Sequence, residues 1–166
     1  MLDRPRIRRQ CQMFVRVGGK QMCLWRAVDA EGEVLDILVQ SKRDTKAARK
    51  LMRKLLKRQG MAPDEWVTDR NPAYGAALRE LKLTRAAHTR RKRANNRAES
   101  SHVPVRRRER KLQGFKSPRS AQRFLSLHAA TYNLFTVPRH LVSARIYRLF
   151  RAEAFEAWRN AVGVAA

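Results

Sequence analysis

Alternating apolar and polar positions dominate the first third of the chain and predict β-strands. Residues 13–17 run into the glycine pair 18–19, which signals a two-residue hairpin, and residues 22–28 follow as the returning strand. A second turn at residues 29–32 leads to a third run at residues 34–39. The pattern therefore predicts three antiparallel strands in a meander.

Helical spacing follows and encloses one short strand. Apolar residues recur every three or four positions over residues 47–56, between Asp44 as N-cap and Gly60 as stop signal. Residues 66–68 are then expected as a short strand that ends at Asp69.

Further elements are expected toward the middle of the chain. A helix over residues 72–81 starts with Asn71 as N-cap and a proline in its first turn. Proline is tolerated there because backbone amides of the first turn have no acceptor within the helix. Residues 83–88 are expected as another short strand. A helix over residues 97–112 contains Pro104, which is expected to kink it.

Two C-terminal helices complete the pattern, one opened by Ser117-Pro118 and one following Pro138. Each carries an apolar stripe at helical spacing, and we expect both stripes to pack in the core rather than to bind a cofactor. The stripes are Ala121, Phe124, Leu125, His128, Ala129 and Tyr132 in the first helix, and Ile146, Phe150, Ala154, Ala157 and Trp158 in the second.

Charge points to a polyanionic partner. The 166 residues carry 38 Lys+Arg against 14 Asp+Glu, a formal net charge of +24, and self-repulsion on this scale opposes compaction unless counter-charge is supplied. Residues 84–123 hold 14 Lys/Arg and 2 Asp/Glu, which is half of the net charge. This concentration favours a nucleic-acid-binding face over a uniformly solvated surface.

Composition excludes several classes of protein. With 43% hydrophobic residues the chain can build the core of one domain with a helical appendage, so it is not a disordered basic tail. No apolar run approaches the roughly 18 residues that span a bilayer, and the N-terminus has no signal-peptide core, so we expect a cytoplasmic protein. Cys11 and Cys23 are expected as reduced, partly buried thiols.

Two carboxylates are candidate metal ligands. Asp69 ends a strand, and Glu99 lies 30 residues later within the basic stretch. Carboxylates from separate elements can converge on a hard divalent cation. Taken alone, Asn96 and Glu99 have the spacing of a capping box, and Asp69 fits an ordinary loop aspartate before a helix. Only the joint pattern favours metal ligation.

Six motifs follow one another along nearly the whole chain: Gly18-Gly19-Lys20, Trp25-Arg26-Ala27-Val28-Asp29, Val67-Thr68-Asp69-Arg70-Asn71-Pro72-Ala73-Tyr74, Asn95-Asn96-Arg97-Ala98-Glu99, Val105-Arg106-Arg107-Arg108-Glu109-Arg110-Lys111 and Gly114-Phe115-Lys116-Ser117. In this order they resemble the DDE catalytic domain of bacterial insertion-sequence transposases. The resemblance implies an α/β fold, a ribonuclease H-like mixed sheet with flanking helices and a helical C-terminal appendage.

The resemblance also implies a site and its partners. Asp69 and Glu99 are the implied catalytic residues and ligands of Mg²⁺ or Mn²⁺, bound weakly or not at all in this chain. The implied partner is DNA, both insertion-element ends and target DNA, with homo-oligomers in the family, no membrane, and a bacterial, nucleoid-associated setting. The expected DNA-binding residues are Arg90, Arg91, Lys92, Arg93, Arg97, Arg106, Arg107, Arg108, Arg110, Lys111 and Lys116.

One departure from the family lies on the first strand. Where the family carries Asp-Glu, this chain reads Cys11-Gln12, and neither side chain is a hard anionic ligand for Mg²⁺. Asp3 and Asp29 are conceivable substitutes, but Asp3 lies ahead of the strand and Asp29 at the far end of a hairpin, so neither is favoured. The family also carries a helix-turn-helix segment ahead of this point, where this chain has ten residues. We therefore expect a truncated copy with impaired catalysis.

These observations predict three segments. Residues 1–10 are a basic N-terminal remnant, residues 11–116 the DDE-type domain, and residues 117–166 helices that pack on it or extend it. The main hypothesis is a DDE transposase domain acting in DNA transposition by metal-dependent phosphoryl transfer, impaired by loss of the first aspartate. One alternative is a non-catalytic DNA-binding remnant that occupies element ends or pairs with intact transposase, and another is a basic RNA-binding protein. His102 is expected at the polar surface and His128 packed on its helix.

Overall fold

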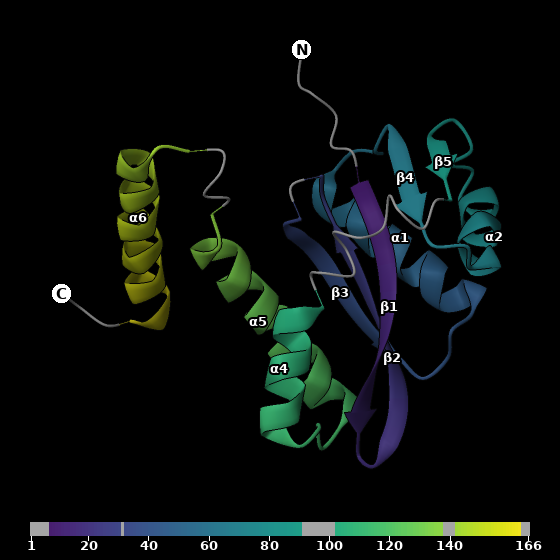
Figure 1. Cartoon of the computed structure of the whole chain (residues 1–166). Helices are drawn as coiled ribbons and strands as arrows, with labels where there is room; N and C mark the ends of the chain where they lie inside the picture. Colours follow the sequence, from purple (N-terminus) through teal and green to yellow (C-terminus); the bar gives the residue numbers. More distant parts are fainter. Residues whose placement is uncertain (1–6, 31, 91–101, 138–141, 164–166) are drawn as a thin grey trace.

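The computed structural model describes residues 7–30, 32–90, 102–137 and 142–163, and of residues 7–12 it describes the backbone alone. Within these residues a five-stranded mixed sheet lies between two layers of helices (Figure 1). The strands are β1 (Ile7–Val17), β2 (Lys20–Val28), β3 (Val34–Gln40), β4 (Glu65–Thr68) and β5 (Ala87–Thr89), in the spatial order β3-β2-β1-β4-β5.

Strand direction decides where the loops meet. β2 is antiparallel to both β1 and β3, whereas β4 is parallel to β1 and to β5. Four strands therefore point the same way, and the loops that follow β3, β4 and β5 open at the same edge of the sheet. The expected meander of β1, β2 and β3 is confirmed, although β1 begins at Ile7, within the segment expected as an N-terminal remnant.

The helices cover both faces of the sheet. α1 (Thr45–Gln59) and α2 (Pro72–Glu80) lie on one face, and α4 (Val103–Leu112) and α5 (Pro118–Phe135) lie on the other (Figure 1). The expected N-caps are confirmed, since the Asp44 carboxylate accepts from the Ala47 amide at 2.9 Å and the Asn71 side chain accepts from the Ala73 amide at 3.1 Å.

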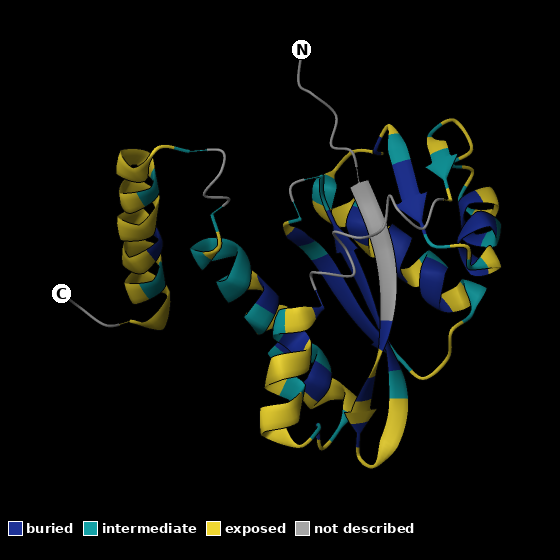
Figure 2. Cartoon of the chain, viewed as in Figure 1, coloured by how far each residue is buried: buried dark blue, intermediate teal, exposed yellow. Residues whose placement is uncertain are grey.

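Two apolar cores hold the layers together, one on each face (Figure 2). Trp25 and Trp66 pack under α1 and α2, where the Trp25 ring meets that of Tyr74 edge-on at 5.4 Å. On the other face Leu24 and Leu125 are buried together beneath α4 and α5. The apolar stripe expected on the first C-terminal helix does pack in this second core.

The last helix departs from the expectation. α6 (Ala144–Val162) forms where helical spacing predicts it, but its apolar residues do not join the core: only Ala154 is buried, while Ile146 and Phe150 are exposed. It contacts the end of α5 through Phe135, whose ring lies 5.1 Å from that of Phe155. The helical spacing predicted the helix correctly. It could not predict whether another element covers the apolar stripe, and the prediction of a buried stripe was wrong.

Two other expectations are corrected. Pro104 does not kink a helix, because α4 begins at Val103 and the proline sits in its first turn, where no amide hydrogen bond is required. The earlier part of the expected helix, residues 97–101, lies outside the described residues. The strand expected at residues 83–88 is shorter and later, Ala87–Thr89, because Lys82 turns the chain with φ of 55°.

The motif Gly114-Phe115-Lys116-Ser117 fastens the β1–β2 hairpin to the end of α4. The Phe115 amide donates to the Arg16 carbonyl at 2.9 Å, and the Phe115 carbonyl accepts from the Gly18 amide at 2.6 Å. Gly114 has φ of 98°, and a Cβ placed there would lie 3.2 Å from the Arg16 carbonyl oxygen. Only glycine meets both conditions without strain.

Replacing Gly114 with alanine is therefore expected to lower the free energy of unfolding by about 2–3 kcal/mol, from backbone strain and crowding of Arg16. The matched control is Gly19→Ala, which has φ of 75° but nothing within 4 Å of the added Cβ, and should cost about 1 kcal/mol. Urea denaturation of both variants measures the difference. Equal losses would show that the close approach to Arg16 contributes nothing.

Candidate active site

The parallel pairing of β1 and β4 brings two candidate positions together. Arg8 pairs with Val67 and, after a register irregularity, Gln10 pairs with Thr68, so the pairing ends one residue before Cys11 on β1 and one residue before Asp69, which follows β4. The same edge receives the loops after β3 and β5. Position 11, where the sequence lacks the expected aspartate, is thus the first β1 position beyond the pairing with β4.

The Asp69 carboxylate is held by two donors. Its Oδ1 accepts from the Asn71 amide at 3.0 Å, and its Oδ2 accepts from the Arg43 guanidinium at 2.9 Å. The neighbouring Thr68 is fully buried, and its hydroxyl lies 2.8 Å from Nε2 of His88 on β5. β4 therefore presents Asp69 in a fixed orientation, with a quarter of its side chain exposed.

These residues fit a divalent metal only in part. A strand-end carboxylate with solvent access suits Mg²⁺, which prefers hard oxygen ligands, whereas a cysteine at position 11 does not. Glu99, the second implied ligand, lies outside the described residues. In the part of the chain that the structure describes, no three His, Cys, Asp or Glu side chains gather into a metal-binding group.

His102 is buried, whereas the sequence predicted a residue at the polar surface, so that prediction was wrong. It precedes α4 and is 8% exposed, and within the described residues its two ring nitrogens have no hydrogen-bond partner. Burial, together with the nearby positive charges of Arg26 and Arg106, lowers the pKa of His102 to about 4. The imidazole is therefore neutral at physiological pH.

The predicted DNA-binding residues fall in two places. Arg106, Arg107, Arg108, Arg110 and Lys111 are all exposed on α4, and Lys116 is exposed just beyond it. Arg90 follows β5 at the edge that carries Asp69, with its guanidinium against Gly75 of α2. The remaining four, Arg91, Lys92, Arg93 and Arg97, lie outside the described residues.

The hairpin extends the basic surface of α4. The Glu109 carboxylate accepts from the Arg16 amide at 2.7 Å, so the one acidic residue of α4 is used to hold the hairpin. Arg16 and Lys20 are exposed on that hairpin. We call the combined surface the basic rim; it consists of Arg16, Lys20, Arg106, Arg107, Arg108, Arg110, Lys111 and Lys116.

Comparison with known proteins agrees with this arrangement. The sequence profile of a family described as the DDE domain matches residues 11–137, which include the β1 position, Asp69 and the basic rim. The chain belongs to the DDE transposase domain family. The resemblance on which the sequence analysis relied is thereby confirmed, and α6 lies beyond the matched segment.

Two relatives from Staphylococcus aureus are similar to this DDE domain. They are the transposase for insertion sequence-like element IS431mec of strain Mu50 and the transposase for insertion sequence element IS257 in transposon Tn4003. Each is 28% identical over 125 residues, which is 73% of this chain and 55% of the relative. The chain thus spans about half the length of these relatives.

The HTLV-2 integrase catalytic core domain, solved in complex with magnesium in a trimeric form, shares the fold. Its TM-score is 0.50 at 15% identity, covering 60% of this chain and 65% of that chain. The predicted ribonuclease H-like α/β fold is therefore confirmed. In the described part of the DDE domain chain, no helix is long and apolar enough to cross a membrane.

Sequence reasoning missed some residues at the site. Alternation with the buried Val15 and Val17 indicates that Arg16 is exposed, but not that it lies beside α4. Arg43 precedes the N-cap of α1 and gave no signal, because its contact with Asp69 joins two loops 26 residues apart.

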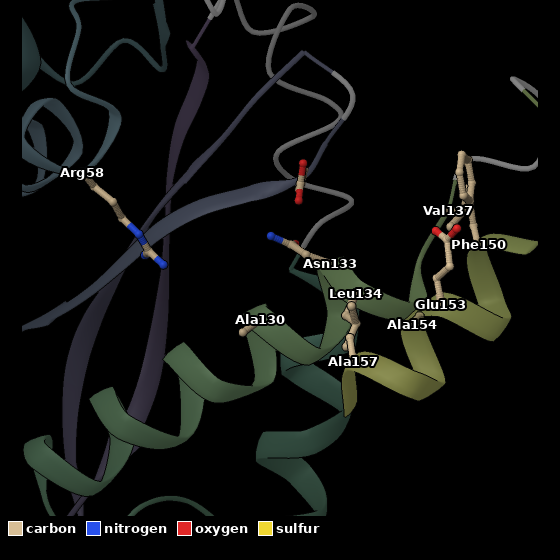
Figure 3. A pocket seen from close by; sticks show the side chains of 10 residues that line it. Arg58, Ala130, Asn133, Leu134, Val137, Phe150, Glu153, Ala154 and Ala157 are labelled. Atoms are coloured by element: carbon tan, nitrogen blue, oxygen red, sulfur yellow. The ribbon is translucent and has the colours of Figure 1, made fainter. Parts of the chain in front are cut away.

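An open pocket of about 590 Å³ lies away from these groups (Figure 3). Its lining comes mainly from α5 and α6, including Asn133, Leu134 and Phe150, and the candidate site residues do not take part.

The buried His102 should make the stability of the DDE domain pH-dependent. Its pKa is about 4 in the folded chain against an ordinary value of 6.5, so between these values the unfolded chain binds more protons. Stability should therefore fall as the pH drops from about 6.5 to about 4, by on the order of 3 kcal/mol from this residue.

Urea denaturation of wild type and His102→Gln between pH 7 and pH 4.5 measures this contribution. The variant should lose less stability over that range, while His88 and His128, whose pKa values burial also lowers, maintain part of the dependence. An identical pH dependence in the two proteins would contradict a buried neutral imidazole at position 102.

Proposed function

We propose that this DDE domain acts in DNA transposition by holding element and target DNA on its basic rim, and that its metal-dependent phosphoryl transfer is impaired. The observation that supports the proposal is the parallel pairing of β1 and β4, which ends at Gln10 and Thr68, immediately before Cys11 and Asp69. DNA binding and phosphoryl transfer are argued from different residues and are tested by different experiments.

Phosphate contacts dominate the proposed binding. The basic rim carries eight exposed Lys/Arg side chains. Oε1 of Glu109 accepts from the hairpin amide of Arg16, and its Oε2 lies 3.8 Å from Nη1 of Arg106, so it offsets one of the eight charges. Guanidinium and ammonium groups neutralise phosphates without reading bases, so binding should tolerate many sequences. Glu99 and the four basic residues Arg91, Lys92, Arg93 and Arg97 are included in the proposal on the sequence alone.

Metal-dependent phosphoryl transfer at the Asp69 edge is proposed to be impaired. When bound, two Mg²⁺ ions supply charge neutralisation on the attacking and leaving oxygens of a phosphodiester. Asp69 and Glu99 are the proposed ligands in this chain. A thiol at position 11 cannot bridge two hard cations as a carboxylate does. The same substitution favours a second candidate function, a non-catalytic DNA-binding role in company with an intact transposase.

Binding to double-stranded DNA should depend steeply on salt. If about six phosphates are neutralised, log K plotted against log salt should have a slope near −5. Exchanging Arg107, Arg110 and Lys111 for glutamine should weaken binding roughly ten- to a hundredfold and make the slope shallower by about 3, because these residues share the outer face of α4.

The control for this prediction is a matched set on α1, Lys46, Lys50 and Arg53, which are also exposed but lie on the opposite face of the sheet. Their change to glutamine should leave affinity and slope nearly unaltered. Fluorescence anisotropy from 50 to 300 mM salt, with RNA as competitor, is the measurement. Equal effects of the two sets, or a preference for RNA, would contradict DNA binding by the basic rim.

Restoring an aspartate at position 11 should strengthen metal binding. Calorimetry with Mg²⁺ should show at most millimolar affinity in the unmodified chain, and Cys11→Asp should tighten it at least tenfold by adding a hard anionic ligand. Asp69→Asn in the Cys11→Asp background should remove the gain. A gain that survives Asp69→Asn would place the metal elsewhere.

A further inference from the structure

Arg43 occupies a position at the Asp69 edge that neither the family match nor the sequence motifs assign to any role. It lies in the loop between β3 and α1, directly before the Asp44 N-cap, and β3 points the same way as β4. The N-terminal ends of α1 and α2 therefore meet at the same edge. The start of α1 fixes the backbone from which Arg43 reaches the candidate site.

The contact is direct and leaves the arginine accessible. Nη2 of Arg43 lies 2.9 Å from Oδ2 of Asp69, and the Arg43 side chain is 46% exposed against 25% for Asp69. The other Asp69 oxygen accepts from the Asn71 amide. Among the described residues, Oδ2 accepts from Arg43 and Oδ1 from the backbone amide of Asn71, so the two donors bind different carboxylate oxygens.

We propose that Arg43 is a built-in counter-ion of Asp69, which competes with a divalent cation for the carboxylate. The inference rests on the proposed metal-binding role of Asp69. Both a guanidinium and Mg²⁺ seek the same anionic oxygen, so metal can coordinate Oδ2 only as Arg43 withdraws. Because the chain lacks the carboxylate expected at position 11, one positive side chain offsets a larger share of the negative charge at this edge.

The magnitude follows from the exposure of the pair. Solvated ion pairs of this kind contribute roughly 0.2–1 kcal/mol, which corresponds to about a 1.4- to 5-fold change in a competing equilibrium. Removing the guanidinium should increase metal affinity within that range. Salt should reduce the effect, because a partly exposed charge pair is screened.

Mn²⁺ titration of the full chain tests the proposal without requiring activity. The readout is paramagnetic broadening of the backbone amide signals of Thr68, Asp69 and Asn71. Arg43→Gln should lower the Mn²⁺ concentration for half-maximal broadening by about 1.4- to 5-fold at low salt, and by less at 0.5 M salt. Arg43→Lys, which retains the charge, should behave like wild type.

The matched control is Arg49→Gln, since Arg49 of α1 makes a comparable partly exposed ion pair with Glu80 of α2 at 2.8 Å. It should leave the Mn²⁺ midpoint unchanged. An unchanged or higher midpoint in Arg43→Gln, while Asp69→Asn abolishes the broadening, would overturn the counter-ion role alone. Broadening that persists in Asp69→Asn would overturn both this role and the proposed metal site.

Discussion

Parallel pairing of β1 with β4 is the constraint on which the candidate site depends. β4 is only four residues long, Glu65–Thr68, and its pairing with β1 ends immediately before Asp69 and position 11. Buried Trp66 and Val67 secure β4 in the sheet, and the Thr68 hydroxyl ties it to His88. A one-residue slip would turn these side chains to opposite faces, so the register is strongly fixed.

The basic rim depends on a different set of contacts. α4 is anchored to the sheet by the buried Val105, and its end is joined to the hairpin by Phe115 and Glu109. The apolar core on this face thus positions a rigid row of cations over the β1–β2 hairpin. Because the basic rim and the Asp69 edge depend on different contacts, a substitution at position 11 is expected to leave the basic rim in place.

Local sequence signals accounted for most elements but not for their surroundings. The Asp44 and Asn71 caps, the 18–19 turn and the stripe of α5 are encoded within a few neighbouring residues, so they were predicted. The burial of His102, the exposure of α6 and the Arg43–Asp69 contact each depend on what a distant segment supplies. Asp69 was found because it ends a strand, whereas Arg43 lies in a loop without periodicity.

Strand cleavage by the purified, unmodified chain tests the central proposal most directly, which is that Cys11 in place of an aspartate impairs metal-dependent cleavage. The substrate is DNA carrying the insertion-element ends, with Mg²⁺ or Mn²⁺, and Asp69→Asn and Cys11→Ala variants are assayed alongside. The account predicts no metal-dependent cutting by any of the three proteins. Robust cutting that survives Cys11→Ala but not Asp69→Asn would contradict it, because another acid would then complete the site.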